Sequence, residues 1–221
     1  MADTRLTWFN IKEHIRKFIW IYIAVIAVVL VVGNLVWIST TPRVPEDQRV
    51  LVYLADAWSD PAPLSGIAQQ ALEAVRREDP SIREVAFESL MYADPEQDYT
   101  GVMLLMTRLA VGEGDVYFAG EKAAEALVNA GACLALDDDW AGGWMKDSGL
   151  EPFYAEITDE ETGETRRFMA GLKLDSLTAL RDLQAFDNAG ACVMIADNGQ
   201  NIASSMAAVE AIVAALKGAA A

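Results

Sequence analysis

The longest uninterrupted run of hydrophobic positions lies near the N-terminus. Residues 18–38 read FIWIYIAVIAVVLVVGNLVWI, and no charged residue occurs between Lys17 and Arg43. About 20 apolar residues are enough to cross the hydrocarbon core of a bilayer as a helix. Aromatic residues stand near both ends of the run, as in the interfacial belts of membrane proteins. The pattern therefore predicts a transmembrane helix over residues 18–38, with the lipid bilayer as its partner.

A cleaved signal peptide is the competing interpretation of this run. The apolar core of a signal peptide usually has about 7–15 residues and is followed by a cleavage site of small residues. Here the run is longer, no Ala-x-Ala motif follows Trp37, and no cysteine follows the run as a lipidation site. We therefore expect a retained anchor.

Basic residues precede the predicted span. Residues 1–17 contain four Lys and Arg, whereas Glu46 and Asp47 accompany two arginines after the span. Positive charge stays on the cytoplasmic side, so we expect a single-pass protein of the cell membrane with a cytoplasmic N-terminus and an extracytoplasmic C-terminal domain. Residues 5–17 are either an amphipathic helix on the inner membrane surface or a charged extension of the spanning helix. His14, the only histidine, falls in this stretch, which excludes histidine triads and His-rich metal sites elsewhere.

Beyond a linker, the chain alternates between strand and helix patterns. Residues 39–47 contain Pro42 and Pro45, which disfavour helix and central strand alike. Residues 48–221 form the predicted outer domain. Short apolar runs typical of buried strands occur at 50–55, 85–91 and 115–118, and helical spacing occurs at 64–78, 99–111 and 121–129. Three strand–helix units in succession predict a doubly wound sheet in a three-layer α/β/α sandwich.

The C-terminal part adds a hairpin and one further strand–helix unit. Residues 153–158 and 165–174 flank the acidic segment 159–164, a pattern that predicts a β-hairpin. Residues 191–196 form an apolar run typical of a buried strand. After a polar turn, residues 201–217 show helical spacing of apolar side chains.

Charge and composition limit the classes of function. With 53% hydrophobic residues and two cysteines, the chain is neither a disordered polymer nor a disulfide-stapled miniprotein. Residues 18–221 hold 13 Lys and Arg against 31 Asp and Glu, a net charge of −18. Affinity for nucleic acid comes mainly from clustered basic side chains, so we exclude nucleic acid as a partner. An acidic surface prefers cationic or neutral partners.

No catalytic motif stands out. The chain contains no Gly-x-Ser-x-Gly elbow, no phosphate-binding P-loop and no HExxH motif. The acidic run Asp137-Asp138-Asp139 lacks the spacing of a Ca²⁺ loop and reads as a solvated turn. We therefore expect a non-enzymatic protein without a cofactor or a metal site.

One stretch resembles a known family. Residues 105–118 read LMTRLAVGEGDVYF, and Glu125-Ala126-Leu127 and the segment GACLALDD at 131–138 follow. This series resembles the extracellular solute-binding proteins of ABC importers, which have the type II periplasmic-binding-protein fold. In that family a helix ends in a glycine-containing turn, a strand of the Asp-Val-Tyr type follows, and a helix then leads to Gly-Ala-x-x-x-Leu-Asp. The glycines permit the tight reversal from helix to strand.

The chain departs from this family in length. Solute-binding proteins trap their ligand between two lobes, and the second lobe would be inserted after about Asp139. The segment 140–167 is too short for such a lobe, so the resemblance implies a single truncated lobe in which this segment, including the hairpin, is a reduced insertion. Trp140 and Trp144 in it either form an aromatic patch for a partner or cover the face where the missing lobe would lie.

The resemblance implies a function in recognition. The leading expectation is an anchored domain that recognises a small solute or a transporter partner such as a permease. The alternative is a protein-interaction or scaffold module of a membrane complex that has lost solute binding.

Candidate ligand-binding residues follow from the predicted sheet. Ligands of doubly wound sheets bind at the carboxyl ends of the strands. Polar, aromatic and glycine residues that we place at these ends are Asp56, Trp58, Asp94, Gly120, Glu121, Asp197 and Asn198. An indole can stack on a flat ligand, and a carboxylate can accept hydrogen bonds from hydroxyl or ammonium groups. In the competing interpretation, Trp58 packs on its own loop and the carboxylates cap turns and helices.

The two cysteines, Cys133 and Cys192, leave two alternatives open. Both lie beyond the predicted span, where a disulfide between them is possible. Each also begins an apolar run, and small buried thiols suit such positions.

Overall fold

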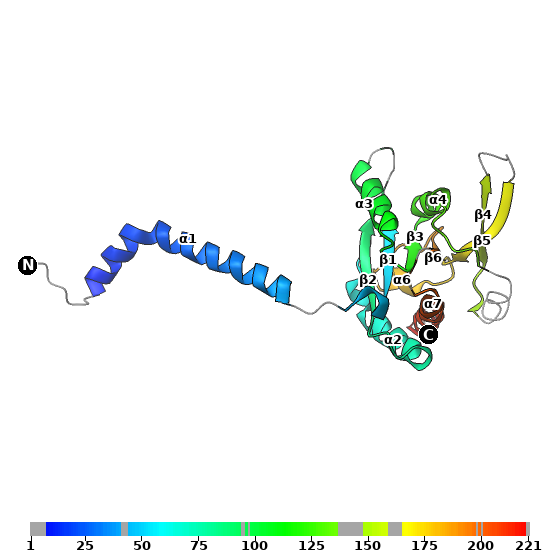
Figure 1. Cartoon of the computed structure of the whole chain (residues 1–221), viewed down its shortest axis with the longest axis horizontal. Coiled ribbons are helices and arrows are strands. Elements are labelled where there is room, and N and C mark those ends of the chain that lie inside the picture. The colour runs from blue at the N-terminus through cyan, green and yellow to red at the C-terminus, as the bar shows by residue number, and fades with distance from the viewer. Residues whose placement is uncertain are drawn as a thin grey trace, which may run out of the picture. The chain divides into compact units, whose positions relative to one another are not determined.

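The computed structural model describes residues 8–40, 44–93, 96, 98–136, 148–158, 165–197, 199 and 201–219. The chain divides into two compact units, Met1–Arg43 and Val44–Ala221. The described part of the first unit is the helix α1 (Trp8–Thr40), drawn in blue in Figure 1. Within it, Arg16–Val36 is long and apolar enough to cross a membrane, and none of this stretch is buried by the rest of the chain. This helix is a candidate membrane anchor or signal sequence.

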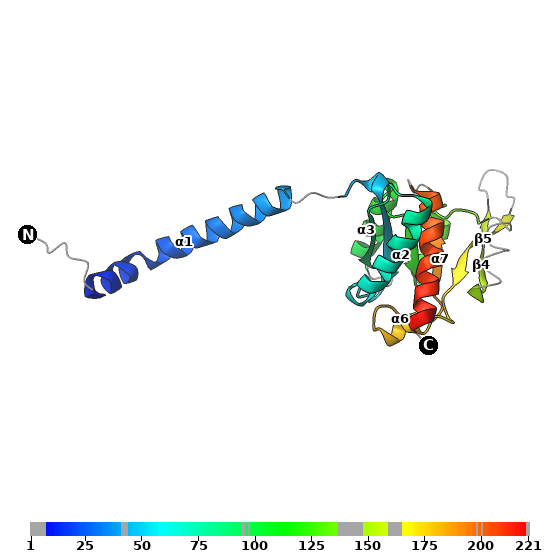
Figure 2. The ribbon, with the colours of Figure 1, turned by 90° about the horizontal axis from the view of Figure 1, so that it is seen from below.

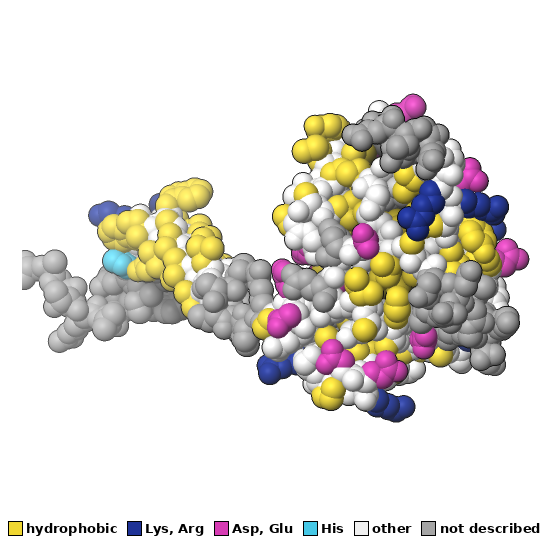
Figure 3. Space-filling view, turned by 45° about the vertical axis from the view of Figure 1, so that its right-hand side comes forward, with side chains coloured by type: hydrophobic (Ala, Val, Ile, Leu, Met, Phe, Trp, Pro, Cys, Tyr) yellow, Lys and Arg dark blue, Asp and Glu magenta, His cyan; other side chains and the backbone are white. Residues whose placement is uncertain are grey.

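The helix α1 reaches beyond the predicted span at both ends. Residues 8–17 belong to the same helix, which agrees with the alternative that this stretch is a charged extension of the spanning helix. Figure 3 shows hydrophobic side chains along α1, with the basic side chains and the histidine toward its N-terminal end.

The second unit is built on one six-stranded mixed sheet of order β2-β1-β3-β6-β5-β4. Its strands are β1 (Arg49–Asp56), β2 (Glu84–Met91), β3 (Val116–Ala119), β4 (Pro152–Thr158), β5 (Thr165–Lys173) and β6 (Cys192–Ile195). The strands β2, β1 and β3 run parallel to one another, whereas β6, β5 and β4 join by antiparallel pairing. The sheet is therefore parallel on one side of β3 and antiparallel on the other.

Helices cover both faces of the sheet, as Figures 1 and 2 show. The helices α2 (Ser65–Glu78) and α7 (Ile202–Ala219) pack on one face, and α3 (Tyr99–Ala110) and α4 (Glu121–Asn129) pack on the other. Side chains of β1 alternate between these two cores, because successive residues of a strand point to opposite faces. The predicted α/β class with helices on both faces of the sheet is confirmed.

The predicted elements of the second unit begin and end within two residues of their expected ends. The short helix α6 (Ala179–Asp182) and two 3₁₀ turns, at Glu46–Gln48 and Ala62–Leu64, were not predicted. The segments 137–147 and 159–164, which include both tryptophans of the proposed insertion, lie outside the described residues.

The predicted hairpin is present and extends the main sheet. Its strands β4 and β5 pair in antiparallel register with a bulge at Phe153/Tyr154, and β5 also pairs with β6. At the junction, a Cβ added to Gly171 would overlap the carbonyl oxygen of Val193 on β6. The lack of a side chain at Gly171 is therefore what lets β5 approach β6 at this point.

Among the described residues, the terminal helix α7 is the other helix that is long and apolar enough to span a membrane. It differs from α1 in its surroundings, since 39% of its most apolar window is buried inside the unit. Ala208, Val209, Ile212, Val213 and Leu216 face the sheet and α2. The helix α7 is thus a core element of the second unit.

Candidate functional site

The candidate site lies where the parallel strands β1 and β3 end. Asp56 is the last residue of β1, and Gly120 follows β3 directly. The backbone N–H of Gly120 donates a 2.9 Å hydrogen bond to the carbonyl of Ala55. A Cβ built on Gly120 would lie 2.9 Å from both Cγ and Oδ1 of Asp56. The structure thus brings two predicted site residues into contact, with glycine making room for the carboxylate.

The carboxylate of Asp56 is half-buried and short of partners. Its Oδ1 accepts a 2.7 Å hydrogen bond from the backbone N–H of Ala57, and within the described part of the chain it has no ion pair with a basic residue. Burial raises the pKa of Asp56, the N–H of Ala57 opposes this, and the charge of Asp187 raises the pKa further. Burial is the largest of these effects. Ionising the Asp56 carboxyl therefore costs more free energy than ionising an aspartate in water.

A second loop comes to the same edge from far along the sequence. Ser59 forms an isolated bridge with Phe186, and the N–H of Asp60 donates to the carbonyl of Ala185 at 2.8 Å. These contacts place the exposed Asp187 close enough for its charge to act on Asp56. Sequence reasoning missed Asp187 because no local pattern links it to a residue 131 positions earlier.

The loop after β1 is itself well fixed. The hydroxyl of Ser59 contacts both the carbonyl of Leu54, at 3.0 Å, and the hydroxyl of Ser89 on β2, at 2.7 Å. Trp58 in this loop is 56% exposed, so less than half of its surface packs against the rest of the chain. Glu121, the first residue of α4, is exposed near the same edge.

Asp197 does not belong to this site, which corrects the prediction. Because β6 is antiparallel to β3, its C-terminal end lies beside the beginning of β3. The N–H of Ala196 donates to the carbonyl of Asp115, and that of Asp197 donates to the carbonyl of Ala132, each at 2.9 Å. Asp197 is therefore at the opposite edge of the sheet from Asp56. Asp94 and Asn198 lie outside the described residues.

The opposite edge holds a cluster of charges that are paired with one another. Glu113 forms ion pairs with Arg49, at 3.8 Å, and with Arg108. The buried Asp115 accepts a 2.9 Å hydrogen bond from the N–H of Leu51, yet burial still raises the pKa of its carboxyl. Since these groups already satisfy one another, we assign the cluster to stabilising the turn before β3.

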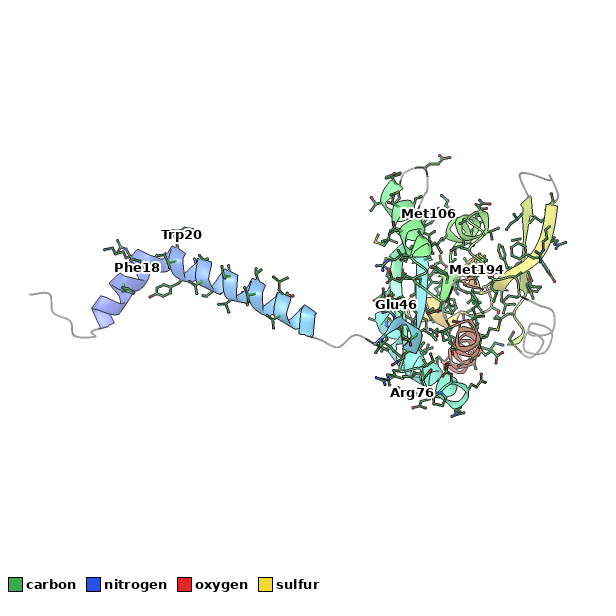
Figure 4. The ribbon with its side chains drawn as sticks, in the orientation of Figure 1. Phe18, Trp20, Glu46, Arg76, Met106 and Met194 are labelled. Atoms are coloured by element: carbon green, nitrogen blue, oxygen red, sulfur yellow. The ribbon has the colours of Figure 1, made fainter. Side chains whose placement is uncertain are left out.

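The two cysteines are free thiols in the structure. Cys192 is buried, and the half-buried Cys133 makes a 3.7 Å contact with the sulfur of Met194, which is labelled in Figure 4. Burial raises the pKa of each thiol to about 12. The thiolate is the reactive form, so both side chains are expected to be inert at neutral pH.

This geometry makes a prediction for thiol chemistry. A thiol-reactive chromogenic disulfide such as Ellman's reagent is expected to label neither cysteine in the native chain at pH 8 within minutes, and two thiols after denaturation. Gln70→Cys, at an exposed position of α2, serves as the reactive control. If the denatured, unreduced chain yields no thiol, the cysteines are joined in a disulfide and the buried-thiol geometry is wrong.

Within the described residues, no group of three or more His, Cys, Asp or Glu side chains is placed to hold a metal ion. Two open cavities lie away from the Asp56 edge. One, of about 350 Å³, runs between α2 and the edge strand β2, and the other, of about 320 Å³, lies between the C-terminal ends of α3 and α4. No protein-family model, no curated protein and no solved structure matches the chain.

Proposed function

We propose that the chain is a membrane-anchored, non-enzymatic recognition protein whose outer unit binds a small cationic solute at the edge formed by Asp56, Gly120 and Asp187. One observation carries this proposal. The half-buried carboxylate of Asp56 has no basic partner among the described residues, and the charge of the Asp187 carboxylate acts on it.

The chemistry of this edge favours an ammonium group. A half-buried carboxylate without a counter-charge is costly, and a neighbouring carboxylate adds to that cost. A bound cation would offset both charges at once. Trp58, two residues from Asp56 and largely exposed, supplies a ring face of the kind that attracts organic cations. The net charge of −18 beyond residue 17 attracts the same class of solute.

The position of the edge supports the proposal independently of charge. It lies at the carboxyl ends of two adjacent parallel strands, where α/β sheets commonly bind ligands. A protein-interaction module is the second candidate function, and it is favoured by α3, on which the large apolar side chains of Tyr99 and Met103 are exposed.

The test is a thermal-shift and calorimetric titration of the full chain in non-ionic detergent with 1,4-diaminobutane and choline. A ligand that binds only the native state adds about 2.7 kcal/mol of stability at one hundred times its Kd. We expect Asp56→Asn to weaken binding at least tenfold and Glu73→Gln, an exposed carboxylate on α2, to leave it unchanged. Equal binding by both variants, or no binding up to millimolar amine, would reject this edge as an amine site.

Binding is also expected to depend on pH. Because the folded-state pKa of Asp56 is raised, its carboxyl takes up a proton at a higher pH than an ordinary aspartate as the pH falls. The neutral form does not attract ammonium, so affinity should fall on acidification through that raised pKa. Asp56→Asn should show a flat profile over the same window, and a matching fall in the variant would assign the dependence to another group.

A further inference from the structure

The helix α3 is apolar on both sides. Gly101, Leu105 and Leu109 are buried against the sheet. On the outer side, Tyr99 is 74% exposed, Met103 48% and Met106 39%. A helix that is hydrophobic all round is normally buried on all sides. The outer face of α3 therefore has the composition of a contact surface.

This outer face carries no charge, in a unit that is otherwise strongly acidic. The only charged residue of α3 is Arg108, which is partly buried and ion-paired with Glu113. The hydroxyl of Thr107 donates a 2.7 Å hydrogen bond to the carbonyl of Met103 within the helix, so it is already satisfied. A second acidic copy of the chain can approach this face without bringing carboxylates of α3 together, because α3 contains none.

The exposed residues also form a regular stripe. Tyr99, Met103, Met106 and Ala110 follow spacings of four, three and four, which is the pattern of helix–helix contact positions. Met106, labelled in Figure 4, also lines the cavity between α3 and α4. In an antiparallel pair of these helices, a twofold axis between Met103 and Met106 places each Met103 opposite Met106 and each Tyr99 opposite Ala110. The largest side chain then meets the smallest, so the stripe is complementary to itself.

The available area suits a weak, reversible contact. Val111, 65% exposed, directly follows the stripe at the C-terminal end of α3. If each large apolar side chain offers about 200 Å² when fully exposed, Val111 and the stripe present roughly 450 Å² per copy. The roughly 900 Å² of a pair lies in the range of weak, transient protein interfaces.

We propose that two copies of this chain associate through α3, packed antiparallel about a twofold axis between Met103 and Met106. A basic partner protein is a weaker match, because the face itself offers no carboxylate to receive it. An anionic membrane surface is disfavoured by the net charge of −18 beyond residue 17. This inference rests on α3 alone, and it stands or falls independently of amine binding at Asp56.

Cysteine crosslinking of the full chain in detergent tests the geometry. With a rise of 1.5 Å per residue, the two copies of position 103, or of position 106, are offset by about 4.5 Å along the helices, within reach of a disulfide. The two copies of position 99 are offset by about 16 Å, which is out of reach. Met103→Cys and Met106→Cys should each crosslink with themselves, whereas Tyr99→Cys should crosslink only when mixed with Ala110→Cys. The wild-type chain, with its own two thiols, is the control.

Sedimentation of the same full chain gives a second, independent readout. We expect a dimer that Met106→Glu weakens at least tenfold, while Gln70→Glu on the exposed side of α2 leaves it intact. Added salt should strengthen the dimer, because it screens repulsion between acidic surfaces while the contact itself is apolar. A monomer at all concentrations, crosslinking without the predicted position pattern, or a dimer that Met106→Glu does not weaken would overturn the proposal. Shielding of these cysteines only on addition of lipid vesicles would assign the face to the bilayer instead.

Discussion

Gly171→Ala is expected to lower the free energy of unfolding by about 3–5 kcal/mol, the largest single effect we predict. A methyl group at this position would overlap the carbonyl oxygen of Val193 and lie 3.1 Å from Cγ of Met194. The obstructing atom belongs to the backbone of β6, which is held within the sheet between β3 and β5. The strand pair must therefore move apart, and the hairpin β4–β5 loses its attachment to the rest of the sheet.

Chemical denaturation followed by circular dichroism measures this effect. Gly66→Ala is the matched control, since a Cβ there meets no atom within 4 Å and the position lies inside α2. The same change at that site should stabilise the protein by about 0.5–1 kcal/mol, because glycine is the poorer helix former. Similar midpoints for the two variants would show that β5 and β6 are not in contact at Gly171.

Asp115→Ala is expected to cost about 2–4 kcal/mol, the second-largest effect. The carboxylate accepts the N–H of Leu51 in β1 and that of Asn201 before α7, so it joins three elements at one buried point. Removing it leaves buried N–H groups without acceptors, at about 1–3 kcal/mol for such a group. Asp115→Asn retains an oxygen acceptor and should lose clearly less stability in urea denaturation.

The pH dependence of these variants has a definite sign. Burial raises the folded-state pKa of Asp115 above its ordinary value, so the folded state binds this proton more tightly than the unfolded state. The contribution of this group to stability is therefore greatest at low pH and declines as the pH rises through the raised pKa. Wild type should gain stability relative to Asp115→Asn on acidification through this window. The other titrating groups are common to both proteins and cancel in the difference. A constant difference across the window would contradict the assignment.

Local patterns in the sequence were enough to locate most elements. The apolar run at 50–55 gave β1, and the helical spacing at 121–129 coincides with α4. These elements are predictable because burial on one or both faces imposes a period on the sequence. The candidate site was predictable in part for the same reason, since Asp56 and Gly120 directly follow such runs.

Strand direction was not available from these patterns. A four-residue buried strand such as β6 has the same composition whether it runs parallel or antiparallel to β3. The assignment of Asp197 to the Asp56 edge failed for that reason. Asp187 was missed because it comes close to Asp56 only after folding. The outer face of α3 was missed because the sequence does not show which of its apolar residues stay exposed. Tyr99 and Met103 are apolar residues at a helical spacing, which is also the pattern of core positions, yet both are exposed in the fold.

The apolar core helix α7 has a consequence for the way the chain is made. A chain exported through a translocation channel would present two apolar segments to the lipid, Arg16–Val36 and the less hydrophobic Ile202–Ala219. Only Arg16–Val36 is expected to pass from the channel into the lipid, because Ser204, Ser205 and Glu210 make Ile202–Ala219 more polar. In an anchored chain these three side chains would thus keep α7 out of the bilayer, whereas a second span would return the C-terminus to the side of the membrane on which the N-terminus lies.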